Sequence, residues 1–257
     1  MKFASIVPTK LLMTSKGQKS SPAALGYHLV LAPQILREPF YRDYYCRLHQ
    51  QGHYIILDNG AAEEGTVSYS ELQMAAEEVG ADEVVIPDVL GDADRTSRLC
   101  EEFPYYDFRH AHLAFVPQGR TPDEWMECAI GNLSLAQMNG GGIHTVMFPK
   151  HTESFLGGRP ALLHRFWGRV KYLYHVHMLG FYANPVKEIR ELRKVDPHNR
   201  IRGVDSGAPV AYAQYNINLY RADVATLKHV SLEWDQLAPW DLIDENTEAI
   251  LEECNPW

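Results

Sequence analysis

The sequence predicts an α/β protein, a (β/α)8 TIM barrel, because short apolar runs recur along it at a nearly constant spacing. Eight runs rich in β-branched and aromatic residues lie along the 257-residue chain. They end at Pro8, Ala32, Asp58, Asp88, Gln118, Phe148, Met178 and Asp205. From the second end to the eighth, the intervals are 26, 30, 30, 30, 30 and 27 residues. A strand, a crossover helix and two short loops occupy about 30 residues, so each interval fits one βα unit.

Helix start signals stand between these runs. Three stretches open with a capping residue followed by an acid or a proline: Ser68 with Glu71, Thr121 with Pro122 and Glu124, and Asn184 with Pro185. A capping box, or a proline at the first helical position, is typical of a helix N-terminus. Apolar residues then recur at helical spacing: Leu72, Ala75, Ala76 and Val79 after the first signal, and Val186, Ile189 and Leu192 after the last.

The first unit is the irregular one. Between Pro8 and Tyr27 the stretch TSKGQKSSPAALG is typical of a polar loop, so an open α/β sheet remains the alternative topology. Past the eighth strand the pattern predicts one helix, a loop and a closing acidic helix. We expect a single domain over residues 1–257, with the barrel over about 1–220 and an acidic C-terminal helical extension over about 221–257.

Composition favours a globular protein of the cytoplasm. Hydrophobic residues make up 46% and charged residues 22% of the chain, both ordinary values. No apolar run approaches the roughly 20 residues that cross a bilayer, and the N-terminus does not resemble a signal peptide. The four cysteines form no CxxC pair, which indicates neither a zinc knuckle nor a disulfide scaffold. We therefore expect reduced thiols, a cytoplasmic location and no membrane partner.

The charge is unevenly distributed along the chain. The net charge is −9, yet residues 1–37 hold five Lys or Arg and no acid, and residues 159–202 hold ten Lys or Arg against three acids. From residue 233 onward there are eight acids and no base. Such segregation lets an acidic protein present a basic face to phosphate, although it is equally compatible with solvated surfaces that bind nothing.

Polar residues at the strand ends form the candidate site. Asp58, Asp88, Gln118 and Asp205 fall in phase with the strand period, and catalytic groups of such barrels lie at the carboxyl ends of strands. A single aspartate there can simply start a loop or cap a helix. Together, three acids and one amide could read a guanine-like base, attack an anomeric carbon and move a proton.

The order of motifs along residues 50–210 resembles the tRNA-guanine transglycosylase superfamily. LDNGAAE (57–63), IPDVLGDADRT (86–96), FVPQGRTPDEW (115–125), HMLGFYANP (177–185) and GVDSGAPVA (203–211) follow the family order. The resemblance implies that Asp205 is the nucleophile and Asp58 the proton-handling acid that contacts the base. It also implies a base pocket made by Asp88, Gln118, Gly119, Met178, Leu179 and Gly180.

Two departures from the family pattern indicate which members of the family the chain resembles. Ala61, Ala62 and Glu63 stand where Gly, Phe and Gln are expected, so the stacking wall of the pocket must come from elsewhere. The family's cysteine-rich zinc site is missing and no RNA-binding domain follows, so neither zinc nor any other cofactor is expected. A short, zinc-free chain is similar to the bacteriophage 7-deazaguanine DNA transglycosylases, which would place the protein in the cytoplasm of a bacterial host.

This resemblance implies replacement of guanine by a 7-deazaguanine such as preQ0, through a covalent glycosyl-aspartate. The expected partners are the free 7-deazaguanine base and a nucleic acid, DNA in preference to tRNA, and a homodimer is left open. We expect the basic segments to flank the mouth and hold phosphates. The candidate phosphate contacts are Lys16, Lys19, Arg120, Lys150, Arg165 and Arg169.

Two other hypotheses compete with base exchange. His110-x-His112 and His175-x-His177 have metal-ligand spacing and raise a metal-dependent amidohydrolase barrel. Those enzymes carry their His-x-His after the first strand, where this chain has Ile6-Val7-Pro8. The other hypothesis is a catalytically silent partner subunit that only binds a base, and the intact Asp205 argues against it.

Overall fold

A computed structural model describes most of the chain. The described residues are 1–62, 67–103, 105–108, 110–138, 140, 142–170, 174–181, 184–196, 198–222, 227 and 229–255. Glu63 of the first family motif lies outside them.

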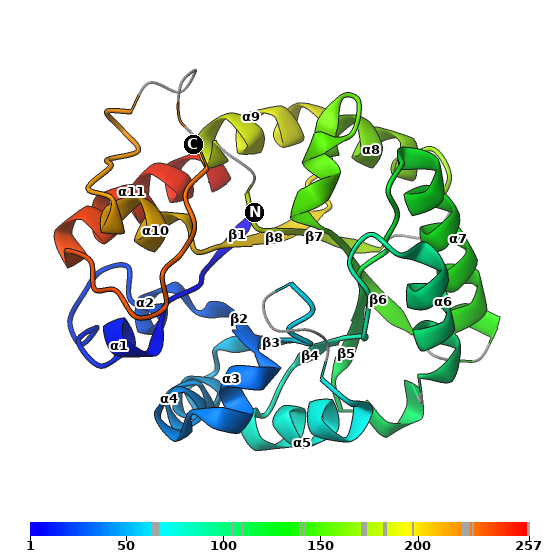
Figure 1. Ribbon diagram of the computed structural model, residues 1–257, viewed down its shortest axis with the longest axis horizontal. Helices are drawn as coiled ribbons and strands as arrows, with labels where there is room; N and C mark the ends of the chain where they lie inside the picture. Colours follow the sequence, from blue (N-terminus) through cyan, green and yellow to red (C-terminus); the bar gives the residue numbers. More distant parts are fainter. Residues whose placement is uncertain are drawn as a thin grey trace.

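Eight parallel strands form a nearly closed barrel (Figure 1), which confirms the predicted (β/α)8 fold. The strands are β1 (Lys2–Ser5), β2 (Tyr27–Leu31), β3 (Tyr54–Asp58), β4 (Glu83–Val85), β5 (His112–Phe115), β6 (Ile143–Phe148), β7 (His175–Leu179) and β8 (Ile201–Ser206). Their order is β1-β8-β7-β6-β5-β4-β3-β2. The two end strands, β1 and β2, also lie against each other, so the sheet curves round into a barrel and is not open.

Helices surround the strands as the sequence predicts. The main ones are α3 (Ala32–Arg37), α4 (Pro39–Gln50), α5 (Tyr69–Val79), α6 (Ala93–Glu102), α7 (Pro122–Met138), α8 (Gly158–Trp167), α9 (Pro185–Val195), α10 (Ala208–Gln214) and α11 (Trp240–Cys254). Two 3-10 turns, η1 (Tyr105–Phe108) and η2 (Lys150–Ser154), complete the connections. The capping box of Ser68 and Glu71 is present, and Asn184 caps α9 by accepting from the amide of Lys187 at 2.9 Å. Among the described helices, none combines the length and apolar character needed to cross a membrane.

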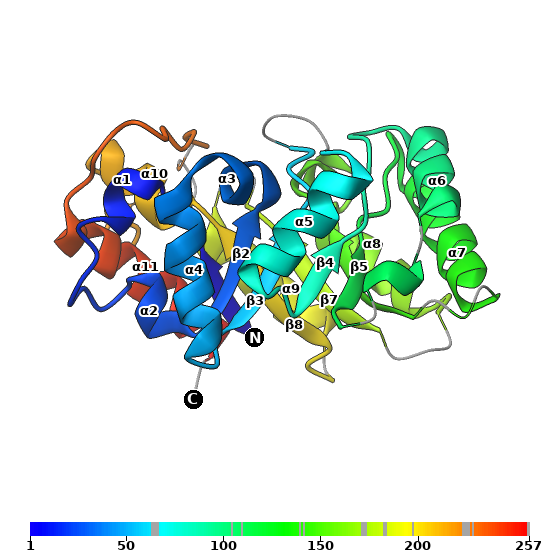
Figure 2. The same cartoon turned by 90° about the horizontal axis from the view of Figure 1, so that it is seen from below.

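The first βα unit is irregular, as expected. It contains only two single-turn helices, α1 (Thr9–Leu12) and α2 (Pro22–Leu25), joined by a loop. The C-terminal helix α11 packs against β1, α9 and α10 on the same side of the barrel as α1 and α2 (Figures 1 and 2). The N-terminal amine donates to the carbonyl of Cys254 at 3.3 Å. The acidic extension therefore covers the part of the barrel wall that the short first unit leaves open.

Two hydrophobic cores lie on either side of the sheet. The larger core fills the space between the strands and the surrounding helices. The smaller one fills the barrel interior, with Ala4, Tyr27, Leu29, Leu31, Ile56, Val85, Ala114, Val116 and Met147 fully buried. Because successive side chains of a strand point to opposite faces, strands such as β1 and β3 contribute neighbouring residues to the two cores.

Candidate functional site

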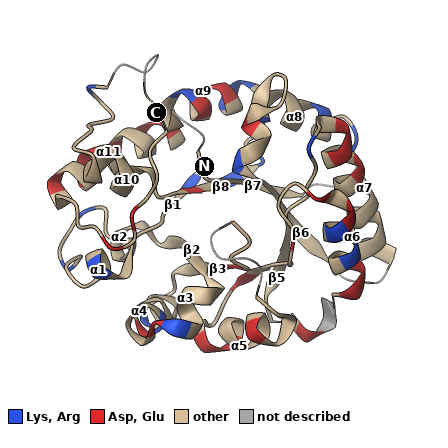
Figure 3. Ribbon diagram, in the orientation of Figure 1, with Lys and Arg blue, Asp and Glu red and all other residues tan. Residues whose placement is uncertain are grey.

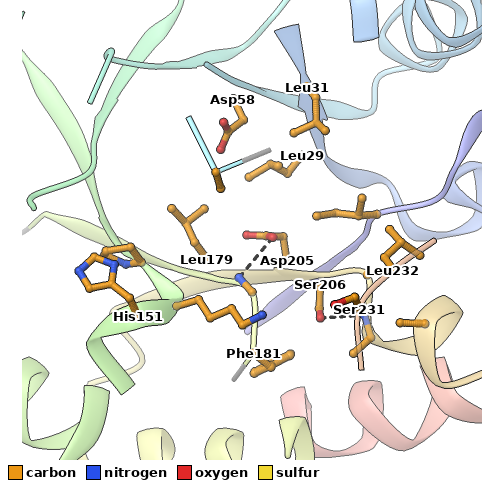
Figure 4. A pocket seen from close by; sticks show the side chains of 18 of the residues that line it. Leu29, Leu31, Asp58, His151, Leu179, Phe181, Asp205, Ser206, Ser231 and Leu232 are labelled. Carbon is orange, nitrogen blue, oxygen red and sulfur yellow. Dashed lines mark hydrogen bonds between the residues drawn. The ribbon is translucent and has the colours of Figure 1, made fainter. Parts of the chain in front are cut away.

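A cavity of about 610 Å³ opens at the carboxyl ends of the strands (Figure 4). This volume is within the range of small-molecule sites in proteins. Most of the predicted base-exchange residues line it: Asp58, Asp88, Gln118, Lys150, Leu179, Gly180 and Asp205. The side chains of Asp58 and Asp205 point into the same space from β3 and β8 (Figure 4). Residues up to 147 positions apart in sequence thus meet at one mouth because parallel strands end at the same edge.

Asp205 is a buried carboxylate of the cavity. It lies in β8 and, like Asp88, is only 3% exposed. Its Oδ1 is 2.9 Å from Nε2 of His177, and its Oδ2 accepts from the amide of Gly180 at 3.3 Å. Within the described part of the chain, each oxygen of this carboxylate has one hydrogen-bond partner and keeps a lone pair that can be directed at a ligand.

Asp88 and Gln118 contact each other at the cavity wall. The Gln118 amide nitrogen donates to Oδ2 of Asp88 at 2.5 Å, and the Asn59 amide nitrogen donates to Oδ1 at 2.8 Å. Gln118 also accepts from the amide of Gly91 through Oε1 at 2.9 Å. Burial raises the pKa of the Asp88 carboxyl to about 6, although the two amide donors oppose the shift. Asp88 is therefore ionised at neutral pH and becomes protonated under mildly acidic conditions.

Asp58 closes the opposite side of the cavity. It ends β3, is half-buried, and accepts from the amide of Gly60 through Oδ1 at 2.7 Å. This bond to a residue two positions on is an Asx-type turn, the ordinary structural use of an aspartate after a strand. The same carboxylate still faces the cavity, so the structural and chemical roles are compatible.

The end of β7 corrects one prediction. Met178 does not line the cavity; it is fully buried in the outer core, between the sheet and the helices. Its neighbour Leu179 faces the cavity instead, because side chains alternate along the strand. The buried Arg159 side chain holds this segment by donating to the carbonyls of Leu179 at 2.9 Å and Gly180 at 2.6 Å, and it forms an ion pair with Glu188.

Gly119, a predicted base-pocket residue, does not line the cavity, but its backbone carbonyl contacts a residue that does. Its carbonyl is 3.2 Å from Nε2 of His151, a side chain that lines the cavity. A Cβ at this position would lie 2.5 Å from the amide nitrogen of Trp125, so only glycine fits. Burial lowers the pKa of His151, so its imidazole is neutral at neutral pH and can donate to that carbonyl.

Aromatic residues that the sequence did not indicate line the rest of the cavity. Phe181 and Tyr212 are buried there, and Trp234 reaches the interior core from the loop before α11. They supply flat apolar surface of the kind that Ala61 and Ala62 cannot provide. Phe181 lies within the 177–185 motif and Tyr212 directly follows the 203–211 motif, but the resemblance gave neither a role, and Trp234 stands in a segment without a motif.

Only part of the expected phosphate-binding set lies near the mouth. Lys150 lines the cavity and contacts His229, and the exposed Arg120 follows Gly119 at the same end of the barrel. Lys and Arg elsewhere are scattered over outer helices such as α4 and α9 (Figure 3).

The four other candidate phosphate contacts, Lys16, Lys19, Arg165 and Arg169, are not among the residues that line the cavity. Lys19 lies 4.0 Å from Glu248 of α11, and Arg165 pairs with Asp123 in the first turn of α7. Lys16 belongs to the same outer loop as Lys19. Arg169 follows α8, which runs back from the mouth because the strands are parallel, so it lies at the far end.

The structure does not bring together the histidines that the amidohydrolase hypothesis requires as metal ligands. His177 is buried inside the barrel with both ring nitrogens in hydrogen bonds, while His112 stacks on His144 with ring centroids 4.3 Å apart. Across the described part of the chain, no three His, Cys, Asp or Glu side chains are grouped so that they could hold a metal ion.

Comparison with known proteins adds no family assignment. No protein-family model matches the sequence, and no curated protein matches it.

Proposed function

We propose that the protein is a transglycosylase that exchanges a guanine-type base of a nucleic acid for a 7-deazaguanine such as preQ0. The observation that carries the proposal is the convergence of Asp58, Asp88, Gln118 and Asp205 on one cavity at the carboxyl ends of the strands. The same residues match the transglycosylase motifs in order. The catalytic ends of barrel strands are where such a set would act.

Asp205 is the nucleophile in this proposal. Its carboxylate attacks C1′ of the target nucleotide, the bond from C1′ to the base breaks, and the electron pair leaves on the base. The incoming base then attacks C1′ and releases Asp205 from the glycosyl ester. Asp58 donates a proton to the departing base and takes one from the incoming base, so the enzyme is regenerated without a redox step or a cofactor.

Asp88 and Gln118 are the base readers. A guanine-type base can donate hydrogen bonds from N1–H and from its exocyclic amine to a carboxylate. Its O6 can accept a hydrogen bond from a carboxamide. Asp88 is ionised at neutral pH, and the NH2 group of Gln118 carries a second N–H beyond the one that Asp88 accepts. Phe181, Tyr212 and Trp234 supply surface for stacking.

The polymer assignment follows from the resemblance and from Lys150 and Arg120 at the mouth. An extruded nucleotide is required because C1′ and the base edge are unreachable inside a stacked duplex. A second candidate is exchange on a free nucleoside, which is favoured because Lys16, Lys19, Arg165 and Arg169 do not line the cavity.

Labelled guanine or preQ0 incubated with duplex DNA, tRNA or guanosine tests the proposal. We expect label in DNA, and a covalent adduct that withstands denaturation in the wild type but not in Asp205→Asn. Asp196→Asn is the matched control, because Asp196 is a buried aspartate that binds backbone amides outside the cavity. Label in guanosine alone would establish the nucleoside-level candidate. No incorporation anywhere, or an undiminished adduct in Asp205→Asn, would reject the proposed chemistry.

A further inference from the structure

A column of polar side chains crosses the barrel interior beneath Asp205. At its base, the Arg202 guanidinium forms an ion pair with Glu83. Arg202 Nε donates to the Tyr27 hydroxyl at 3.3 Å, and that hydroxyl is 2.9 Å from Nδ1 of His177. The other nitrogen of His177 is 2.9 Å from Asp205. An uninterrupted chain of hydrogen bonds therefore links the floor of the barrel to the cavity.

With a neutral His177, one arrangement of protons makes every contact of the column a hydrogen bond. Arginine can only donate, so the Tyr27 oxygen accepts from Arg202. Burial raises the pKa of Tyr27, so the phenol keeps its proton at neutral pH and donates it to Nδ1 of His177. With Nδ1 as acceptor, a neutral imidazole carries its proton on Nε2 and donates it to Asp205.

Packing holds Tyr27 in the position that this network requires. Its ring stacks on that of Tyr54 with centroids 5.7 Å apart, and the Arg202 guanidinium lies 5.8 Å from the Tyr27 ring centroid. A Cβ at position 203 would lie 2.7 Å from the Tyr27 hydroxyl oxygen and ring edge. Glycine at this position of β8 thus leaves the space into which Tyr27 extends.

We propose that His177 is a positioning residue for Asp205, and that Tyr27, held by Arg202 and Glu83, sets the tautomer in which it works. The catalytic consequence rests on the proposed function, whereas the tautomer does not. A fixed Nε2–H on Oδ1 and the Gly180 amide on Oδ2 hold the carboxylate in one orientation. Orientation of a nucleophile towards the reacting carbon is a major source of rate enhancement.

The tautomer is measured directly by NMR of protein labelled with 15N-histidine at neutral pH. The His177 signals are assigned by their loss in His177→Gln. We expect Nε2 to be protonated and Nδ1 to be an unprotonated acceptor. Tyr27→Phe removes the only donor that the column offers to Nδ1, so the two tautomers should then exchange. A wild-type Nδ1–H tautomer, or spectra unchanged in Tyr27→Phe, would overturn the inference.

The positioning role is tested by base-exchange kinetics. His177→Phe should lower kcat about 10- to 100-fold, the usual loss for a hydrogen bond to a charged group, with little change in KM for the base. His177 does not line the cavity, which is why binding should persist. His177→Gln keeps an N–H donor near Nε2 and should restore most of kcat. His175→Gln, on the same strand but exposed, is the control and should leave kcat within about twofold.

Gly203→Ala provides a second variant if His177→Phe does not fold. Its methyl group should displace Tyr27 without removing any hydrogen-bonding group, and give the mixed tautomer of Tyr27→Phe. Equal losses of kcat in His177→Phe and His177→Gln would reject the positioning role. If no substrate is turned over, the proposed function fails, and the NMR result alone decides the inference about the column.

Discussion

The mouth and the floor of the barrel both carry buried carboxylates, but the partners of these carboxylates differ between the two regions. At the floor, Glu83 is fully buried and paired with the guanidinium of Arg202, which also lies 5.3 Å from the Tyr54 ring centroid. At the mouth, Asp88 accepts from two neutral carboxamides, and Asp205 accepts from the Gly180 amide beside His177. At the floor, the charge of Glu83 is balanced by Arg202 within the fold. At the mouth, Asp88 and Asp205 line a cavity.

The difference separates a structural use of acid from a chemical one. A buried acid matched by a guanidinium contributes to stability only while both partners are present. A buried acid contacted by neutral donors remains costly to ionise, and the raised pKa of Asp88 reports that cost. Sites that perform chemistry commonly carry such perturbed groups. Substitution at the floor should therefore lower stability, whereas substitution at the mouth should change ligand binding and the pH dependence of stability.

The largest effect on stability is expected at the floor. Glu83→Gln leaves Arg202 mostly buried without its counter-charge, which should cost about 3–5 kcal/mol of unfolding free energy. Urea unfolding followed by circular dichroism measures it. Lys19→Gln, which removes one partner of an exposed pair, is the control and should cost under about 1 kcal/mol. A loss below 1 kcal/mol in Glu83→Gln would remove the distinction between floor and mouth.

A smaller, pH-dependent effect is expected at the mouth. The folded-state pKa of Asp88 is raised from 3.8 to about 6, so the folded protein binds the proton more tightly than the unfolded chain. The contribution of Asp88 to stability is therefore most favourable below pH 4, and it declines as the pH rises towards 6. Relative to wild type, Asp88→Asn should gain about 2–3 kcal/mol between pH 4 and pH 7.

Unfolding titrations of both proteins at the two pH values measure this shift. Binding of the base should show the opposite dependence, because the proposed contact needs the ionised carboxylate. Its affinity should fall about tenfold from pH 7 to pH 5. A pH-independent stability difference, together with pH-independent binding, would show that Asp88 does not titrate in this range.

The smallest effect concerns the surface cations. Lys150→Glu should weaken DNA binding about tenfold and reduce its salt dependence, since Lys150 lines the cavity. Lys19→Glu and Arg165→Glu should change it less than about twofold, because neither residue lines the cavity and each already lies beside an acid. Fluorescence anisotropy with labelled duplex DNA at several salt concentrations measures the differences. A stronger effect of Lys19→Glu than of Lys150→Glu would place the polymer on the outer wall.

Local features of the fold were predictable from the sequence because they depend on neighbouring residues. The capping box at Ser68 and the cap at Asn184 satisfy amides within three positions, so their motifs are sufficient to predict them. The spacing of 30 residues placed Asp58, Asp88 and Gln118 at equivalent points of successive units. Parallel strands then bring equivalent points to one edge, and the cavity contains all three.

The sequence did not show which side chains of each barrel strand point into the barrel and which point towards the helices. Strand β7 (HVHML) ends in two adjacent apolar residues, Met178 and Leu179, so the sequence does not show which of them points into the barrel. The charge distribution was misleading for a related reason. Lys19 and Arg165 belong to basic segments, but a helix or loop turns its charges outward wherever its apolar side meets the sheet.

The sequence by itself therefore determined the barrel, the starts of three helices and the residues near the strand ends that meet at the mouth, since periodicity and capping are short-range properties. Only the tertiary structure decided what lies beneath and around that mouth. The contact of Tyr27 with His177 spans 150 positions, and that of His177 with Asp205 spans 28. Neither contact has a local signature, because each depends on the inward face of separate strands and on the space that Gly203 leaves for Tyr27.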